Sequence, residues 1–261
     1  MLERSIKNLC RQIYDEESIK RVTQNYFRFL ATVQDDIIQK RLLEELIKGY
    51  VALEKRVDNL LKNTLPQTVA DEIKDEGKYR PRPFDCTILF TDIAGFTKMA
   101  ERLPGEVLLE LLNRLFGEMD DVLAELKGTK IKTIGDSYMA VFGAPVEYED
   151  HAVMAVRAGL SLVQLVNAFN MRNNEDIQMR IGIHTGRVMA GVVGKERMQF
   201  DIFGDNVNIA SRFESSGEVG KVNVSQSTYM RTQNLFLFEE RGEIPLKNKG
   251  YMKAYFVLKE L

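Results

Sequence analysis

Apolar positions recur with helical spacing through the first part of the chain. From residue 19 onward they follow steps of three or four residues, the period of an amphipathic helix. From residue 43 the steps alternate regularly between three and four, and in a heptad reading every d position is leucine. This pattern predicts an N-terminal helical segment over 1–40 and a short parallel coiled coil over 41–64. A helix packed on its own domain is the alternative.

A stretch rich in helix breakers follows and predicts a linker over residues 65–83. The breakers in it are Pro66, Gly77, Pro81 and Pro83. Beyond it, short apolar runs alternate with longer helical patterns. The predicted strands are 86–93, 130–134, 137–142, 178–186, 199–203, 222–225, 236–244 and 254–260, and the predicted helices are 97–127, 149–172 and 206–213. This order predicts an α+β fold, with a ferredoxin-like βαββαβ core and C-terminal additions, over residues 84–261.

Composition narrows the class of protein. The 261 residues are 44% hydrophobic and 28% charged, which is enough for one sizeable core and excludes a disordered chain. A net charge of −2 argues against a nucleic-acid partner, and two cysteines indicate a reducing compartment rather than a disulfide framework. No apolar run approaches the ~20 residues that span a bilayer. We therefore expect a cytoplasmic protein without a membrane span in this chain.

Two aspartates stand at turns that the predicted topology brings together. Asp92 ends a buried strand, before a glycine-containing turn whose free N–H groups over 94–97 suit phosphate oxygens. Asp136 lies in the tip of a two-residue hairpin, where aspartate is ordinary turn chemistry. In a ferredoxin-like sheet this hairpin neighbours the first strand, so the two carboxylates repel unless they share a proton or hold a cation. Such oxygen ligands favour Mg²⁺ or Mn²⁺ and point to two-metal phosphoryl or nucleotidyl transfer.

Four separated motifs make a resemblance to a known family specific. FTDIAGFT, KTIGDSYMAVFG, MRIGIHTG and FDIFGDNVNIASRFE, in this order, resemble the catalytic domain of class III nucleotidyl cyclases, over about Phe84 to Leu261. The resemblance implies conversion of a nucleoside triphosphate to its 3′,5′-cyclic monophosphate and pyrophosphate. It also implies a homodimer with active sites at the subunit interface.

The resemblance assigns roles to the metal and transition-state positions. Asp92 and Asp136 match the aspartates that bind two divalent cations, and the backbone carbonyl of Ile93 matches a further metal contact. Asn208 matches the residue that orients the ribose, and Arg212 the one that stabilises charge on the α-phosphate. Because these two are four residues apart on one predicted helix, they share a face.

Further positions match those that hold the substrate. Arg180 and Lys247 match the residues that bind the β- and γ-phosphates, and Lys249 remains an alternative to Lys247. Phe96 and Thr97 lie in the phosphate-binding turn after the first strand.

Lys132 and Asp201 match the two positions that recognise the purine in this family. A lysine donor and an aspartate acceptor complement N1 and the exocyclic N6 of adenine, whereas guanine reverses both. Guanylyl cyclases of this family typically carry Glu and Cys there. The resemblance therefore favours an adenylyl cyclase that uses ATP. The alternatives are a guanylyl or mixed-purine cyclase and a silent dimerisation or nucleotide-sensing module, although every catalytic position is intact.

The remaining expectations concern regulation and the two histidines. Residues 65–83 resemble the short element that joins input helices to the catalytic domain in this family. The N-terminal helices are therefore a candidate docking point for an upstream sensor domain or regulatory protein. We expect His184 to be a packed structural residue and His151 a surface residue or helix cap, with neither needed as a base.

Overall fold

The computed structural model describes residues 24, 28, 36–62, 64–195, 197–246 and 250–261. Most of the predicted segment 1–40, together with Lys247 and Lys249, lies outside these residues. The chain divides into two compact units, residues 1–64 and 65–261. Each unit is described by itself.

The first unit contains helix α3 (Asp36–Lys62), so a helix is confirmed over most of the predicted coiled coil. Its apolar stripe is exposed within this unit: Leu43, Ile47, Tyr50, Leu53 and Val57. An exposed stripe of this kind is what a paired helix would cover. The pairing itself stays a prediction.

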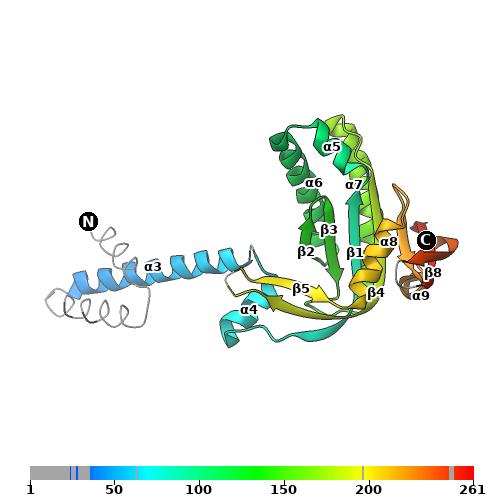
Figure 1. The fold of residues 1–261 in the computed structure, drawn as a ribbon. Coiled ribbons are helices and arrows are strands. Elements are labelled where there is room, and N and C mark those ends of the chain that lie inside the picture. The colour runs from blue at the N-terminus through cyan, green and yellow to red at the C-terminus, as the bar shows by residue number, and fades with distance from the viewer. Residues whose placement is uncertain (1–23, 25–27, 29–35, 63, 196, 247–249) are drawn as a thin grey trace. The chain divides into compact units, whose positions relative to one another are not determined.

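The second unit is built on one mixed eight-stranded sheet (Figure 1). Its strands are β1 (Arg82–Ile93), β2 (Gly128–Ile134), β3 (Ser137–Phe142), β4 (Met179–Val193), β5 (Gln199–Phe203), β6 (Val222–Ser225), β7 (Phe236–Leu246) and β8 (Gly250–Glu260). The first four form an antiparallel sheet in the order β2-β3-β1-β4, which confirms the ferredoxin-like core. Strand β6 pairs parallel to β4, and β8 and β7 extend the sheet beyond it. Strand β5 pairs with the far half of β4.

Helices cover both faces of this sheet. They are α4 (Gln67–Glu76), α5 (Phe96–Arg102), α6 (Gly105–Glu125), α7 (His151–Asn173), α8 (Asp205–Ser215) and α9 (Gln226–Thr232). Ile181 and Ile183 of β4 belong to the main core with the buried side chains of α6 and α7. The alternate face of β4 carries α8, since successive side chains of a strand point to opposite faces.

The structure differs from the sequence-based expectations at three places. The predicted helix 97–127 is two helices, because Pro104 cannot continue a helix and leaves Leu103 extended. The predicted linker contains α4, whose Val69 and Ala70 are buried, so residues 65–83 fold within the second unit. Helix α9 was missed, although Ser225 caps it by accepting a hydrogen bond from the Thr228 N–H.

Helix α7 is, among the described residues, the one helix long and apolar enough to cross a bilayer by length and composition. Half of its most apolar window is buried inside the domain. Leu162, Val166 and Phe169 on this helix are part of the main core. Packing against β1 and β4 accounts for the apolar character of α7. A helix in the core of a domain can be as long and as apolar as one that crosses a membrane.

The close approach of α8 to β4 leads to a stability prediction. A Cβ atom at Gly182 would lie 1.9 Å from the backbone nitrogen of Glu214, whereas a Cβ at the exposed Gly117 of α6 would meet nothing within 4 Å. Gly182→Ala should therefore lower the free energy of unfolding by about 2 kcal/mol. Gly117→Ala should raise it by about 0.5–1 kcal/mol. Urea unfolding followed by circular dichroism measures both, and equal stabilities would contradict the packing.

Candidate active site

Asp92 stands at the end of the central strand β1, where it pairs in register with Arg180 of β4. The chain then turns through Gly95, which adopts a left-handed backbone with φ of 75°, and enters α5. Phe96 and Thr97 are the first residues of α5, where N–H groups have no partner within a helix. The expectation that the N–H of Ala94 is also free is wrong, because it donates to the Gln178 carbonyl over 2.7 Å.

The hairpin between β2 and β3 brings a second carboxylate to Asp92. Ser137 Oγ donates a hydrogen bond to Asp92 Oδ1 over 2.7 Å. Burial raises the pKa of the neighbouring Asp136, and the charge of Asp92 raises it further, although backbone N–H groups including that of Ile93 lower it. The two aspartates thus lie close enough for their charges to interact, as the topology predicted.

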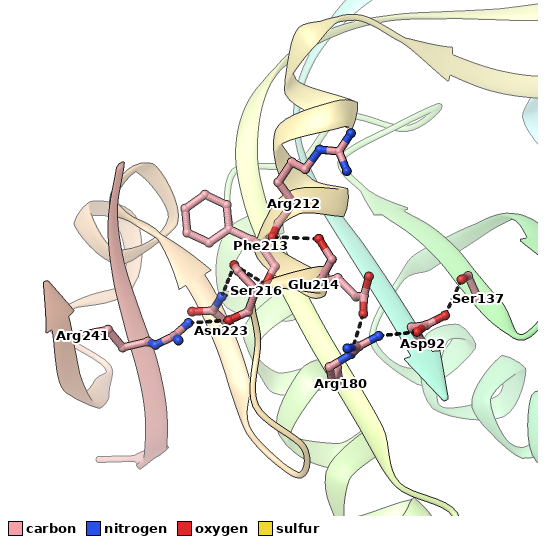
Figure 2. Close-up of polar contacts among 10 residues, drawn as sticks. Asp92, Ser137, Arg180, Arg212, Phe213, Glu214, Ser216, Asn223 and Arg241 are labelled. Atoms are coloured by element: carbon pink, nitrogen blue, oxygen red, sulfur yellow. Dashed lines mark hydrogen bonds and ion pairs between the residues drawn. The ribbon is translucent and has the colours of Figure 1, made fainter. Parts of the chain in front are cut away.

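Arg180 ties Asp92 to helix α8 through two ion pairs (Figure 2). Its Nη2 lies 2.6 Å from Asp92 Oδ2, and its Nε lies 3.1 Å from Glu214 Oε1. Burial raises the pKa of Glu214 to about 7, and the charges of Asp92 and Asp136 also raise it, whereas Arg180 lowers it. Two carboxyl groups therefore contact one guanidinium group, and the charge of Asp136 acts on the same cluster.

Sequence reasoning missed Glu214 and Ser137 as members of this cluster. For Glu214 a signal did exist. Gly182 lies on the same face of β4 as Arg180, and a glycine inside a strand often marks the close approach of another backbone. For Ser137, the first residue of β3, the one-dimensional pattern contains no such signal.

The purine-reading candidates form a second cluster. Lys132 Nζ on β2 lies 2.5 Å from Asp201 Oδ2 on β5, although 69 residues separate them in the sequence. The other oxygen of Asp201 accepts the N–H of Ile202 over 2.9 Å. Both side chains are partly buried. The structure thus brings together the two residues assigned to base recognition.

Asn208 and Arg212 lie on α8, on its solvent side. Asn208 is exposed, and the Arg212 side chain points away from the ion pairs of Asp92 (Figure 2). No hydrogen bond or ion pair engages the Arg212 guanidinium among the residues that the structure describes. Within one chain, therefore, the transition-state candidates do not meet the carboxylates.

The donor set of the carboxylate cluster fits a hard divalent cation. Within the described ranges, no group of three or more His, Cys, Asp or Glu side chains could hold a metal by itself. Asp92, Asp136 and the carbonyl of Ile93 nevertheless offer oxygen ligands of the kind that Mg²⁺ or Mn²⁺ uses when substrate phosphates complete the coordination. The excess of negative charge in the cluster also favours the binding of a cation.

Comparison with known proteins decides the family. The sequence model of the adenylate and guanylate cyclase catalytic domain matches residues 79–259. The chain belongs to this family, the class III nucleotidyl cyclases. Catalytic domains of these cyclases generally use divalent metal ions. The fold and the order of the four motifs agree with this membership.

Relatives of this cyclase domain include named guanylate cyclases. The receptor-type guanylate cyclase gcy-28 of Caenorhabditis elegans is 34% identical over 258 residues, 97% of this chain and 20% of that protein. Atrial natriuretic peptide receptor 2 of Homo sapiens is 38% identical over 228 residues, 85% of this chain and 22% of that protein. The chain thus spans about a fifth of the length of these curated relatives.

Solved cyclase structures of both purine classes match equally well. The guanylate cyclase domain of RhGC from Catenaria anguillulae, in complex with GTP, has a TM-score of 0.67 at 34% identity, covering 69% of this chain and 100% of that chain. The adenylyl cyclase CyaB from P. aeruginosa also has a TM-score of 0.67, at 30% identity, covering 69% of this chain and 97% of that chain. The similarity of the backbone therefore does not distinguish a guanylate cyclase from an adenylyl cyclase.

The pKa of Glu214 leads to a prediction for the metal-free cyclase domain. Since the folded-state pKa is about 7 and the ordinary value is 4.5, the folded state holds this proton more tightly than the unfolded state. The contribution of Glu214 to wild-type stability should therefore fall as pH rises from 4.5 to about 7. Glu214→Gln stays neutral, so its free energy of unfolding relative to wild type should rise by about 2 kcal/mol across this window.

Chemical denaturation at several pH values, in a buffer with chelator, measures the difference. Glu101→Gln, at an exposed position on α5, is the control and should show no such trend. A difference for Glu214→Gln that does not change with pH would contradict the buried, crowded position of this carboxyl.

Proposed function

We propose that this domain is an adenylyl cyclase that converts ATP to 3′,5′-cyclic AMP and pyrophosphate. The observation that carries the proposal is the contact of Lys132 with Asp201, at 2.5 Å between Nζ and Oδ2. Adenine presents an acceptor at N1 and a donor at N6, which a lysine donor and an aspartate acceptor complement. Guanine presents N–H at N1 and an acceptor at O6, so both contacts would be mismatched.

A guanylyl or mixed-purine cyclase is the second candidate. It is favoured by the relatives, since gcy-28 and the soluble subunit beta-2 proteins are named guanylate cyclases. Against it stands the lysine–aspartate pair, which supplies the donor and the acceptor that adenine requires.

The mechanism follows from the residues at the two clusters. Bound at Asp92 and Asp136, a divalent cation would favour ionisation of the ribose 3′-hydroxyl and neutralise phosphate charge. Asn208 would hold the ribose so that the 3′-oxygen faces the α-phosphorus, and Arg212 would stabilise charge on the α-phosphate. The new O3′–P bond forms as the bond to the β-phosphate oxygen breaks, and pyrophosphate leaves. Arg180 would exchange its carboxylate partners for the β- and γ-phosphates.

The site requires a second chain in this proposal. Asn208 is exposed and Arg212 points away from the ion pairs of Asp92 on one subunit, so the two would act on nucleotide held by Asp92 and Asp136 of the other. The exposed stripe of α3 would pair with its copy as a coiled coil, and residues 65–83 would carry changes from an upstream sensor or regulatory protein. Lys247 or Lys249 would complete the phosphate contacts. We propose a cytoplasmic homodimer with no nucleic-acid partner and no membrane span in this chain.

One assay tests the activity directly. The purified chain is incubated with ATP or GTP and Mn²⁺ or Mg²⁺, and cyclic nucleotide and pyrophosphate are quantified by mass spectrometry. Cyclic AMP in excess of cyclic GMP supports the proposal. Faster turnover of GTP establishes the guanylyl alternative, and no metal-dependent product from either nucleotide establishes the silent module.

A double substitution tests the assignment of the base-reading pair. Lys132→Glu with Asp201→Cys should lower kcat/KM for ATP by at least about tenfold, because both contacts to the adenine edge are lost. Mn²⁺ binding, followed by calorimetry, should be unchanged. The control is Lys130→Glu on the same strand, where the lysine pairs with Asp120 at the surface. If the double variant turned over ATP like wild type, these residues would not read the base.

Mixing two inactive variants tests the shared site. Asp92→Ala and Arg212→Ala should each be nearly inactive as homodimers, since every composite site carries the lesion. After subunit exchange about half of the dimers are mixed, and each has one intact site, so activity should return to roughly a quarter of wild type. No recovery, despite exchange demonstrated by mass spectrometry, would show that one chain supplies both residues.

A further inference from the structure

Helix α8 packs on one face of strand β4. Four residues on this face, at steps of two, lie beneath the helix: Arg180, Gly182, His184 and Gly186. A Cβ at Gly182 would collide with the backbone of Glu214, and a Cβ at Gly186 would lie 2.5 Å from the Asn206 side chain. The two glycines thus let both ends of the helix approach the strand, and His184 stands between them.

His184 holds α8 near both of its ends. Its Nε2 lies 2.9 Å from Asn206 Oδ1, and its ring is stacked almost parallel on Phe213, with centroids 6.2 Å apart. Because the amide nitrogen of Asn206 donates to the Arg187 carbonyl, Oδ1 faces the histidine and accepts its Nε2–H. Nδ1 then accepts a hydrogen bond from the Ser225 hydroxyl over 2.8 Å.

The ring itself is fixed by the interior of the sheet. His184 is only 4% exposed, and burial lowers its pKa, so the neutral form is the one present at neutral pH. Ser225 lies 3.2 Å from the hydroxyl of Thr228, which lies 2.9 Å from that of Thr185. This buried network of hydroxyl groups leaves the imidazole a single orientation.

The contacts of His184 bracket the transition-state candidates. Asn206 precedes Asn208 by two residues, and Phe213 directly follows Arg212. We infer that His184 is a positioning residue, which acts through Asn206 and Phe213 to set the rotation of α8 and hence the aim of Asn208 and Arg212. The inference rests on the proposed function of those two residues. It adds a role for a histidine that the sequence alone presents as core filling.

Two substitutions separate the hydrogen bond from the packing. His184→Phe keeps an aromatic ring on Phe213 and removes the donor to Asn206, whereas His184→Gln restores an amide donor at a similar distance from the backbone. His184→Phe should lower kcat about tenfold or more with KM for the nucleotide within about threefold, since misaligned groups fail in the transition state. His184→Gln should recover most of kcat.

The matched control is His151→Phe. The expectation that His151 is a surface residue or helix cap is wrong, because it is as buried as His184 and follows the cap residue Asp150. It contacts Thr87 and Arg231, away from α8. The variant should lose thermal stability while its kcat stays near wild type. A folded His184→Phe with wild-type kcat would overturn the inference, and so would an equal loss of kcat in His151→Phe.

Subunit mixing distinguishes a positioning role of His184 from a merely structural one, because only a positioning role predicts which partner variant restores activity. His184→Phe damages the α8 half of a site, so mixing with Asp92→Ala should restore activity and mixing with Arg212→Ala should not. The reverse pattern would overturn the inference. The pair Asp92→Ala with Arg212→Ala reports separately on the shared site. If that pair fails, one chain supplies both residues and the proposed shared site fails, while kcat and KM of His184→Phe alone still decide the role of His184.

If His184→Phe does not fold, Asn206→Ala takes its place. Asn206 is partly exposed at the start of α8, and its loss removes the same hydrogen bond from the other side. The same fall in kcat and the same mixing pattern support the inference. Wild-type kcat in Asn206→Ala overturns it.

Discussion

The close contact between helix α8 and strand β4 is the constraint on which the rest of the domain depends. At Gly182 the helix backbone lies so near the strand that even a methyl group has no room. This proximity allows Glu214 to reach Arg180, which in turn holds Asp92. A helix placed one side-chain layer further out would lose these ion pairs. The same helix presents Arg212 on its opposite side, so one packing contact sets the geometry of both halves of the proposed shared site.

The charges of the carboxylate cluster do not balance within the chain. Arg180 is the one cation in contact with Asp92 and Glu214 among the described residues, and Asp136 adds a further acid beside them. Burial and this excess of negative charge together raise the pKa values of Asp136 and Glu214, because both favour the protonated acid. Cations and a triphosphate together would relieve it: the cations neutralise the aspartates, and the phosphates give Arg180 new partners. The charge pattern of the cluster is thus the one expected of a site that takes up cations together with an anionic substrate.

The sequence predicted what depends on local pattern, and missed what depends on contacts between distant segments. The ferredoxin-like core followed from the order of apolar runs, and with it the meeting of Asp92 and Asp136. The ion pair of Glu214 could not be predicted in this way, since a glutamate near a helix end usually faces solvent and only the depth of α8 on β4 buries it. Pro104 was a readable break in the predicted helix 97–127, whereas the bond that occupies the Ala94 N–H needed the position of Gln178.

Similarity of sequence and selectivity for the base depend on different parts of the molecule. Identity of 34% to 38% with these relatives extends over most of this chain, and guanylate and adenylyl cyclase structures share its backbone fold. In the proposed function, by contrast, the purine edge would be met by two side chains, one on β2 and one on β5, whose exchange would leave the core packing almost unchanged. A pair of residues that recognises the base can therefore diverge while the fold, the metal ligands and the packing of α8 on β4 stay constant. For this reason the proposal of ATP as the substrate is argued from the local contact between Lys132 and Asp201 and not from the names of the relatives.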